Sequence, residues 1–167
     1  MEISNKNVIV TGGANGIGKA LAKAFKNAGA SYILIADLDE TEGQRTADEL
    51  GIKFKKTDVS SESDIIELIA TANNDTQSID IFCSNAGIGG APMLLDVSTK
   101  DWQNIWEINV MSHIYAAKNV LPQMIENGSG YLMNTASAAG LLTQVGAAPY
   151  SVCLLYTSDA ADDSLRV

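Results

Sequence analysis

Several features are scarce in this sequence, and each scarcity removes a class of protein. Only 2 cysteines occur in 167 residues, too few for a disulfide framework. The 11 Lys and Arg residues are outnumbered by 20 Asp and Glu, and the net charge of −9 argues against nucleic acid or an acidic membrane surface as a partner. No apolar run approaches the roughly 20 residues that span a bilayer, and residues 1–6 (MEISNK) do not form a signal peptide. We therefore expect a cytoplasmic protein without membrane contact.

The sequence does contain a regular alternation of short apolar runs and amphipathic stretches. Its hydrophobic fraction of 46% is ordinary, and 167 residues suffice for one domain with its own core. Strands are predicted at Asn7–Thr11, Ser31–Ala36, Ile52–Thr57, Ile79–Ser84 and Gly130–Thr135. Helices are predicted at Gly16–Ala28, Thr41–Leu50, Ser61–Asn73 and from about Thr99 to Asn127. Such alternation predicts an α/β fold, a doubly wound parallel sheet with helices on both faces.

A glycine-rich segment, residues 11–18 (TGGANGIG), joins the first predicted strand to the first predicted helix. Glycines allow the backbone to approach a pyrophosphate, and the N–H groups of the first helical turn face its negative charge. Strand, glycine-rich turn and helix together predict a dinucleotide site, which the glycine pattern alone would not.

An acidic residue ends the second predicted strand. Asp37 lies about twenty residues after Gly18, where a carboxylate can accept hydrogen bonds from the adenosine ribose hydroxyls. A 2′-phosphate would meet like charge there, and Asn15, Leu38 and Asp39 supply no cation to offset it. We therefore predict NAD(H) rather than NADP(H). The alternative is a strand-end Asp that only caps the next helix.

Five motifs, in this order along the chain, resemble those of the short-chain dehydrogenase/reductase family. Residues 11–18 resemble its TGxxxGIG turn, and Asp58-Val59 follows the third predicted strand. Asn85-Ala86-Gly87 follows the fourth strand, with Ser84 in place of the first Asn of the family's NNAG motif. The remaining two motifs are Asn109 in the long helix, and the pair formed by Ser137 after the fifth strand and Tyr150 thirteen residues later. The ordered set is far more specific than any one member.

The resemblance implies a Rossmann-like fold in residues 1–152, truncated after the fifth strand, and an NAD(H)-dependent enzyme. Its reaction would interconvert a small alcohol and a carbonyl compound such as a ketone by hydride transfer, and the intact parent would be a homo-oligomer. The implied catalytic residues are Asn109, Ser137 and Tyr150. The implied cofactor contacts are Gly12, Asn15, Gly16, Ile17, Gly18, Asp37, Leu38, Asp58, Val59, Asn85, Ala86, Gly87 and Tyr150.

The implied chemistry has one departure from the family. Ser137 would bind the substrate oxygen, Asn109 would hold a water of the proton relay, and Tyr150 would be the acid/base. A free tyrosine has a pKa of about 10, so its phenolate needs a nearby cation at neutral pH. The family supplies a lysine four residues after the tyrosine, but here that position is Leu154 and no lysine follows Lys118. We therefore expect this chain to be inactive.

The last fifteen residues do not resemble the family. Residues 153–162 (CLLYTSDAAD) resemble the translation of a transposase-type sequencing adapter and lack helical amphipathicity. We therefore predict that residues 153–167 are a non-native tail, outside the domain of residues 1–152.

Other interpretations stay open. A non-catalytic dinucleotide-binding protein of the same fold would need neither Ser137 nor Tyr150, and a sugar-nucleotide epimerase is a more distant option. His113, the only histidine, is interpreted as structural, and Trp102 and Trp106 are interpreted as packing residues on one helix face.

Overall fold

A computed structural model describes residues 2–89, 94–142 and 146–163, with side chains described as far as residue 155. The chain divides into two compact units. We call Met1–Ala86 with Ser112–Asn134 the sheet unit, and Gly87–Met111 with Thr135–Val167 the helical unit. Across the described residues, no helix is both long and apolar enough to cross a membrane.

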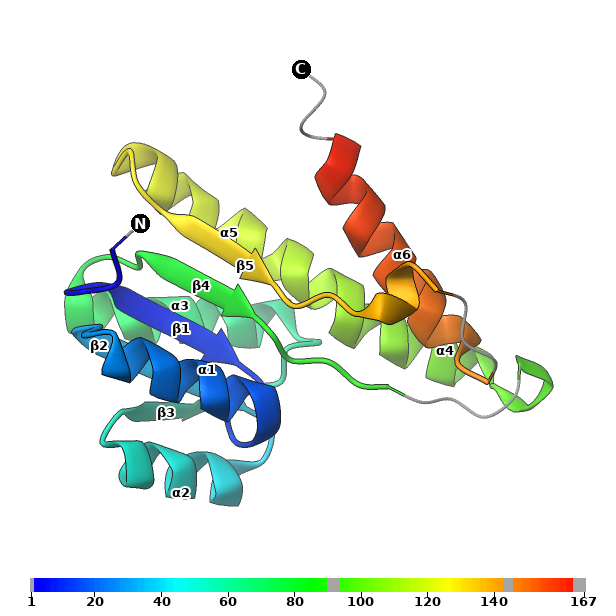
Figure 1. The fold of residues 1–167 in the computed structure, drawn as a ribbon, viewed down its shortest axis with the longest axis horizontal. Helices are drawn as coiled ribbons and strands as arrows, with labels where there is room; N and C mark the ends of the chain where they lie inside the picture. Colours follow the sequence, from blue (N-terminus) through cyan, green and yellow to red (C-terminus); the bar gives the residue numbers. More distant parts are fainter. Residues whose placement is uncertain (1, 90–93, 143–145, 164–167) are drawn as a thin grey trace. The chain divides into compact units, whose positions relative to one another are not determined.

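The sheet unit is built on five parallel strands, as the alternating pattern predicts. Their bounds are β1 Asn7–Thr11, β2 Tyr32–Asp37, β3 Lys53–Lys56, β4 Ile81–Ser84 and β5 Tyr131–Asn134. The strand order is β3-β2-β1-β4-β5, so chain order reverses at β1 and all carboxyl ends point the same way (Figure 1). Ligands of open parallel sheets bind beyond the carboxyl ends of the strands at such a reversal.

Four helices cover the two faces of this sheet. Their bounds are α1 Gly16–Asn27, α2 Glu40–Leu50, α3 Glu62–Thr76 and α5 Ser112–Glu126. Helices α1 and α2 pack against β1, β2 and β3, whereas α5 packs against α3 and contacts β4 and β5. Figure 1 shows α1 in front of the sheet and α3 and α5 behind it. The fold is thus the predicted Rossmann-like α/β arrangement, and each predicted strand matches an observed one.

The core of the sheet unit follows from continuous apolar strands, which two covered faces require. On one face, Val8, Val10 and Ile35 join Phe25 of α1 and Leu50 of α2 in one buried cluster. Residues that alternate with these along the strands are also buried, namely Ile9, Leu34 and Phe82. Burial on both faces fixes the carboxyl ends of β1, β2 and β4 relative to one another.

The helical unit contains the elements that follow β4 and β5. They are the 3₁₀ turns η1 Leu94–Asp96 and η3 Ala138–Gly140, the helices α4 Thr99–Trp106 and α6 Ala148–Asp163, and the π-helical turn η2 Glu107–Met111. Helix α6 packs against η3, η2 and α4. A small buried cluster of Ile105, Val110 and Cys153 joins them, with Trp106 packed against it.

The long segment predicted from about Thr99 to Asn127 is helical from Thr99 to Glu126, but it is not a regular α-helix throughout. The π-helical turn at Glu107–Met111 separates α4 from α5, and Asn109 lies within that turn. π-Helical turns are rare and frequently mark functional sites. The start of α4 is as predicted, because Ser98 and Asp101 form a reciprocal capping box.

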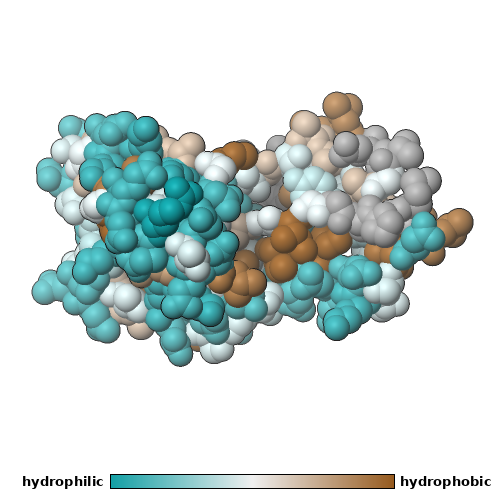
Figure 2. All heavy atoms as spheres, turned by 90° about the horizontal axis from the view of Figure 1, so that it is seen from below, coloured by the Kyte–Doolittle hydropathy of each residue, from teal (hydrophilic) through white to brown (hydrophobic). Residues whose placement is uncertain are grey.

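The surface differs along the chain. Figure 2 shows mostly hydrophilic side chains over α2, a helix in which most residues are acidic or polar. Among the side chains of the helical unit that the structure describes, six large apolar ones are exposed, namely Leu94, Leu95, Leu141, Leu142, Val152 and Leu155.

Candidate functional site

The glycine-rich turn between β1 and α1 has a shape that only glycine permits. Gly16 has a φ of +53°, a left-handed conformation that side chains rarely adopt, and nothing lies within 4 Å of where its Cβ would be. A Cβ on Gly18 would instead overlap the carbonyl oxygen of Gly12. The turn is therefore closely packed at Gly18 and open at Gly16, which leaves room beside the backbone for a ligand.

The start of α1 is prepared differently from the starts of α2 and α3. Asp39 and Ser61 cap α2 and α3 with side-chain hydrogen bonds, and both helices carry acidic residues in the first turn. Asn15, within the described residues, caps α1 without a side-chain hydrogen bond, and the first turn of α1 is free of acidic residues. The N–H groups at a helix start carry partial positive charge, so this end of α1 is suited to an anion.

Asp37, the last residue of β2, is fixed beside the turn. Its Oδ2 accepts a hydrogen bond from the backbone N–H of Ala14 at 3.0 Å, and its Oδ1 accepts one from the N–H of Asp39 at 3.1 Å. Each carboxylate oxygen has a second lone pair, so the group can still accept hydrogen bonds from a ligand. Leu38 next to it is 63% exposed and Ile17 in the turn is 66% exposed, so two apolar side chains lie uncovered near these polar groups.

Thr11 joins the ends of β1 and β4. Its Oγ1 accepts hydrogen bonds from the N–H groups of Asn85 and Ala86 at 3.0 and 3.1 Å, and it donates to the Cys83 carbonyl at 3.4 Å. Asn85 returns the contact, because its Nδ2 donates to the Thr11 carbonyl at 3.1 Å. Asn85 and Ala86 are thereby held against the first strand. Sequence reasoning assigned no role to Thr11, although a buried threonine that ends an apolar strand was a visible signal.

Asp58 and Val59 follow β3 as predicted. The Asp58 Oδ1 accepts hydrogen bonds from the N–H and the Oγ of Ser60, at 3.0 and 2.6 Å. The Asp58 N–H donates to the Asp64 carboxylate at 3.1 Å, and hydrogen bonds to that carboxylate, chiefly from Ser61, lower its pKa. Val59 is buried. This loop is therefore fixed by its own hydrogen bonds beyond the carboxyl end of β3.

In the helical unit, Asn109 is bound at both ends of its side chain. Its Oδ1 accepts from the Ile88 N–H at 2.9 Å, and its Nδ2 donates to the Ile88 carbonyl at 2.8 Å. A Cβ on Gly87 would lie 3.1 Å from the Asn109 Oδ1, so a glycine there lets the two segments approach. The buried Asn109 amide therefore holds the loop after β4 against the π-helical turn.

Ser137 and Tyr150 belong to elements of the helical unit that pack together, η3 and α6. Ser137 caps η3, and its Oγ accepts a hydrogen bond from the Ala139 N–H at 3.2 Å. Tyr150 lies in the first turn of α6, and both side chains are half-buried. The helical unit thus contains all three predicted catalytic residues, since Asn109 lies on η2, which also packs against α6.

The position one helical turn after Tyr150 is apolar and buried. Leu154 is 4% exposed, and its neighbour Cys153 is fully buried against Ile105 and Val110. Burial in this cluster also raises the pKa of the Cys153 thiol. This segment therefore serves packing and supplies no positive charge to a phenolate. Helix α6 continues through Asp163, across the residues predicted to be a foreign tail.

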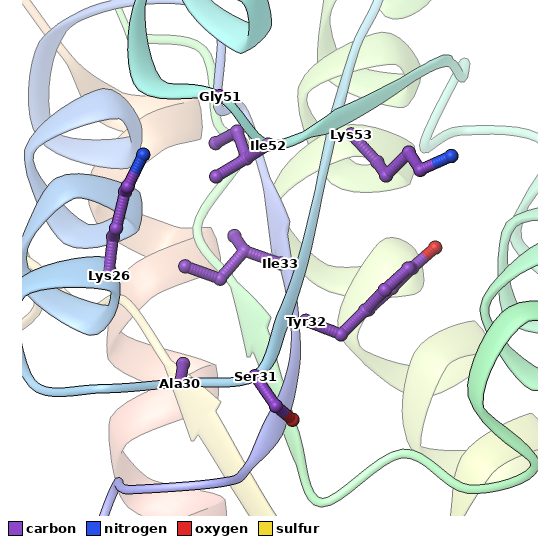
Figure 3. A pocket seen from close by; sticks show the side chains of 8 residues that line it. All are labelled: Lys26, Ala30, Ser31, Tyr32, Ile33, Gly51, Ile52 and Lys53. Carbon is purple, nitrogen blue, oxygen red and sulfur yellow. The ribbon is translucent and has the colours of Figure 1, made fainter.

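A pocket of about 410 Å³ lies at the amino ends of β2 and β3, remote from the glycine-rich turn (Figure 3). Figure 3 shows Lys26 and Lys53 on opposite sides of β2, so their ammonium groups do not converge. Lys26 donates to the carbonyl of Leu50, the last residue of α2, which favours a cation there. This pocket therefore includes neither the glycine-rich turn nor the carboxyl ends of the strands, on which the dinucleotide prediction rests.

Comparison with protein families gives a match over most of the chain. A family model described as short chain dehydrogenase matches residues 6–153, and the match ends one residue before Leu154. Among curated proteins, the chain is 33% identical to the uncharacterized oxidoreductase YvrD of Bacillus subtilis, over 91% of this chain and 59% of the relative. It is 31% identical to an uncharacterized oxidoreductase of Staphylococcus aureus, over 89% of this chain and 65% of the relative.

Solved structures resemble the whole described fold. A short chain dehydrogenase/reductase from Burkholderia phymatum in complex with NAD matches with a TM-score of 0.94 and 27% identity, over 98% of this chain and 60% of that one. A 3-ketoacyl-(acyl-carrier-protein) reductase from Brucella melitensis complexed with NADH matches with a TM-score of 0.90 and 26% identity, over 95% and 68%. The chain spans about three-fifths of the length of the first relatives it matches.

Proposed function

The chain belongs to the short chain dehydrogenase family, and from that premise we propose that it derives from an NAD(H)-dependent oxidoreductase that interconverts an alcohol and a carbonyl. The observation that carries the proposal is the contact of Asp37 with the Ala14 N–H, because it holds the carboxylate proposed to bind the ribose beside the turn proposed to bind the phosphates. When bound, NAD(H) would accept or supply the hydride.

The residues of the sheet unit fit this cofactor. Open space at Gly16 and the start of α1, where the described residues show no side-chain capping hydrogen bond from Asn15, suit a pyrophosphate. The exposed side chains of Leu38 and Ile17 offer apolar surface to the ring systems of the cofactor. Asp37 would accept hydrogen bonds from the adenosine ribose and would repel a 2′-phosphate. We therefore propose NAD(H) rather than NADP(H).

The proton chemistry is proposed for the helical unit. Tyr150 would give or take a proton at its phenolic oxygen, Ser137 would donate a hydrogen bond to the substrate oxygen, and Asn109 would hold the loop at Ile88 in position. The substrate would be a small alcohol or ketone. Both ends of the Asn109 side chain are already bound, which favours positioning by this residue over direct binding of a water.

Leu154 leads us to propose that this chain turns over slowly or not at all. A phenolate is favoured by nearby positive charge, and the buried Leu154 supplies none. The apolar Leu154 and the end of the family match at residue 153 also favour the proposal that residues 153–167 are not native to the oxidoreductase from which the chain derives. The apolar Leu154 also supports a second candidate function, dinucleotide binding without catalysis.

Titration of the purified chain with NADH and NADPH, followed by nicotinamide fluorescence, tests the cofactor proposal. We expect NADH to bind at least tenfold more tightly than NADPH. In Asp37→Asn the NADH dissociation constant should rise about tenfold, because one acceptor for the ribose is lost. That of NADPH should change little, because the lost repulsion of its 2′-phosphate offsets the lost acceptor. Asp39→Asn is the matched control, since Asn also caps helices and Asp39 serves as the cap of α2. Tighter binding of NADPH by the wild-type chain would contradict the proposal.

A further inference from the structure

Thr46 is a fully buried polar residue in α2, and its hydroxyl reaches the glycine-rich turn. It is 0% exposed, and its Oγ1 donates a hydrogen bond to the carbonyl oxygen of Ala14 at 2.6 Å. The two residues are 32 positions apart in sequence. A buried hydroxyl without a partner destabilises a fold, and a valine of nearly the same shape would fill the space without that demand. The reason for a hydroxyl at this position therefore lies in its hydrogen bond to Ala14.

Ala14 lies in the middle of the turn and is held from two directions. Its carbonyl accepts from Thr46, while its N–H donates to the Oδ2 of Asp37 at 3.0 Å. Its side chain is fully buried, and the preceding residue, Gly13, donates its N–H to the Ala36 carbonyl at 3.1 Å. The orientation of the Ala14 backbone is therefore set by α2 on one side and by the end of β2 on the other.

We infer that Thr46 is a positioning residue for the dinucleotide: its hydroxyl fixes the Ala14 backbone, and through it couples the Asp37 carboxylate to the phosphate-facing turn. The inference rests on the proposed function. Loss of the hydroxyl would leave the Ala14 carbonyl without this donor, so the turn would adopt several arrangements. Asp37 would then lose its fixed donor at Ala14, and both the ribose and the pyrophosphate would meet a less organised site.

Two substitutions separate this role from simple packing. Thr46→Val keeps the shape and removes the hydroxyl, whereas Thr46→Ser keeps the hydroxyl and removes a buried methyl group. We expect Thr46→Val to raise the NADH dissociation constant about tenfold and Thr46→Ser to leave it within about twofold. Thermal unfolding compares the stability of the two variants, and we expect their melting temperatures to fall by similar amounts.

Thr76→Val is the matched control at the other end of the sheet unit. The Thr76 Oγ1 lies 2.8 Å from the carbonyl oxygens of both Ala72 and Ser78 and can donate its one proton to either, so a comparable hydroxyl contact is lost far along α3. We expect this variant to lose stability and to bind NADH as the wild type does. ADP, which keeps the ribose and the pyrophosphate, should show the same pattern as NADH.

The double variant Thr46→Val with Asp37→Asn tests the coupling. Because both residues act through Ala14, its NADH dissociation constant should rise by less than the product of the two single effects. Strictly multiplicative effects would overturn the coupling. Unchanged NADH binding in Thr46→Val, or losses that follow thermal stability equally in all variants, would overturn the positioning role. A wild-type chain that binds neither NADH nor ADP would overturn the proposed function and this inference together.

Discussion

The sheet unit and the helical unit hold their functional residues in different ways. In the sheet unit, Asp37, Thr11 and Asn85 each bind backbone groups of another segment, so the turn and both strand ends are fixed before any ligand arrives. In the helical unit Asn109 is held similarly, but buried Leu154 occupies the position, four residues after Tyr150, where the proposed mechanism would need a charge. We therefore propose that nucleotide binding and turnover depend on separate parts of this chain.

The sheet unit also buries more apolar side chains in its core than the helical unit does. The sheet unit has a core cluster of ten buried residues on one face of its sheet, whereas a described cluster of the helical unit contains three. Large apolar side chains also remain exposed in the helical unit, with Leu95 97% and Leu141 82% exposed. Since stability rises with buried apolar area, we expect the sheet unit to resist local unfolding better than the helical unit.

The largest effect should come from placing a positive charge at position 154, because it would give the helical unit the cation that its proposed chemistry lacks. In Leu154→Lys, an ammonium group one helical turn after Tyr150 would favour the phenolate. We expect turnover of small alcohols with NAD, or of ketones with NADH, to rise about 100-fold, the lower end of general acid–base effects. The measurement is the change in nicotinamide absorbance with time.

Leu155→Lys is the control for that gain, because Leu155 is 57% exposed and lies on a different side of α6. We expect no gain from it, and adding Tyr150→Phe to Leu154→Lys should abolish the gain. If Leu154→Lys binds NADH yet turns over no faster than the wild type, the missing lysine is not what limits this chain.

A methyl group on the glycine-rich turn should damage the sheet unit far more than one on the loop after β4. In Gly18→Ala the new Cβ would overlap the Gly12 carbonyl, so we expect NADH binding to weaken more than tenfold and stability to fall by about 1–3 kcal/mol. In Gly89→Ala the Cβ meets nothing within 4 Å, and the change should stay within about 0.5 kcal/mol. Urea unfolding and NADH titration measure both effects, and equal damage from the two would contradict the contrast.

The smallest expected effect concerns pH and the sheet unit. His113 on α5 is 8% exposed, burial lowers its pKa, and its Nδ1 has no hydrogen-bond partner among the residues that the structure describes. The unfolded chain takes up a proton there below a pH of about 6.5, while the folded chain keeps the neutral form. The contribution of neutral His113 to the free energy of unfolding is therefore complete above a pH of about 6.5. It is lost as the pH falls toward the pKa of His113 in the folded chain.

Melting temperatures at a pH of about 7.5 and about 5 measure this effect. We expect the wild type to lose about 3 °C more than His113→Leu over that interval, because each kcal/mol shifts the midpoint of a chain of this size by a few degrees. An equal loss in both proteins would show that His113 does not contribute to the pH dependence.

The sequence alone predicted the strands because these depend on local patterns, and the proposed nucleotide site rests on local patterns too. Apolar runs such as residues 79–84, the glycine-rich turn and Asp37 at a strand end are each readable within a few positions.

The features that the sequence did not reveal depend on distant or subtle contacts. The contact of Thr46 with Ala14 links two segments that only the fold brings together, and threonine inside a helix has many ordinary explanations. The π-helical turn at Glu107–Met111 was missed because its residues fit a continuous helical pattern, whereas the amide of Asn109 is bound to Ile88 outside the helix. The roles of Ser137 and Tyr150 remain predictions.

The wider turn at Glu107–Met111 also changes how the residues on either side of it should be counted. A π-helical turn takes up one residue more than an α-helical turn, and each residue rotates a helix by about 100°. A single helical wheel drawn at about 100° per residue through Thr99–Glu126 therefore does not apply across this turn. Surface redesign of this segment should use two wheels, one ending at Trp106 and one beginning at Ser112.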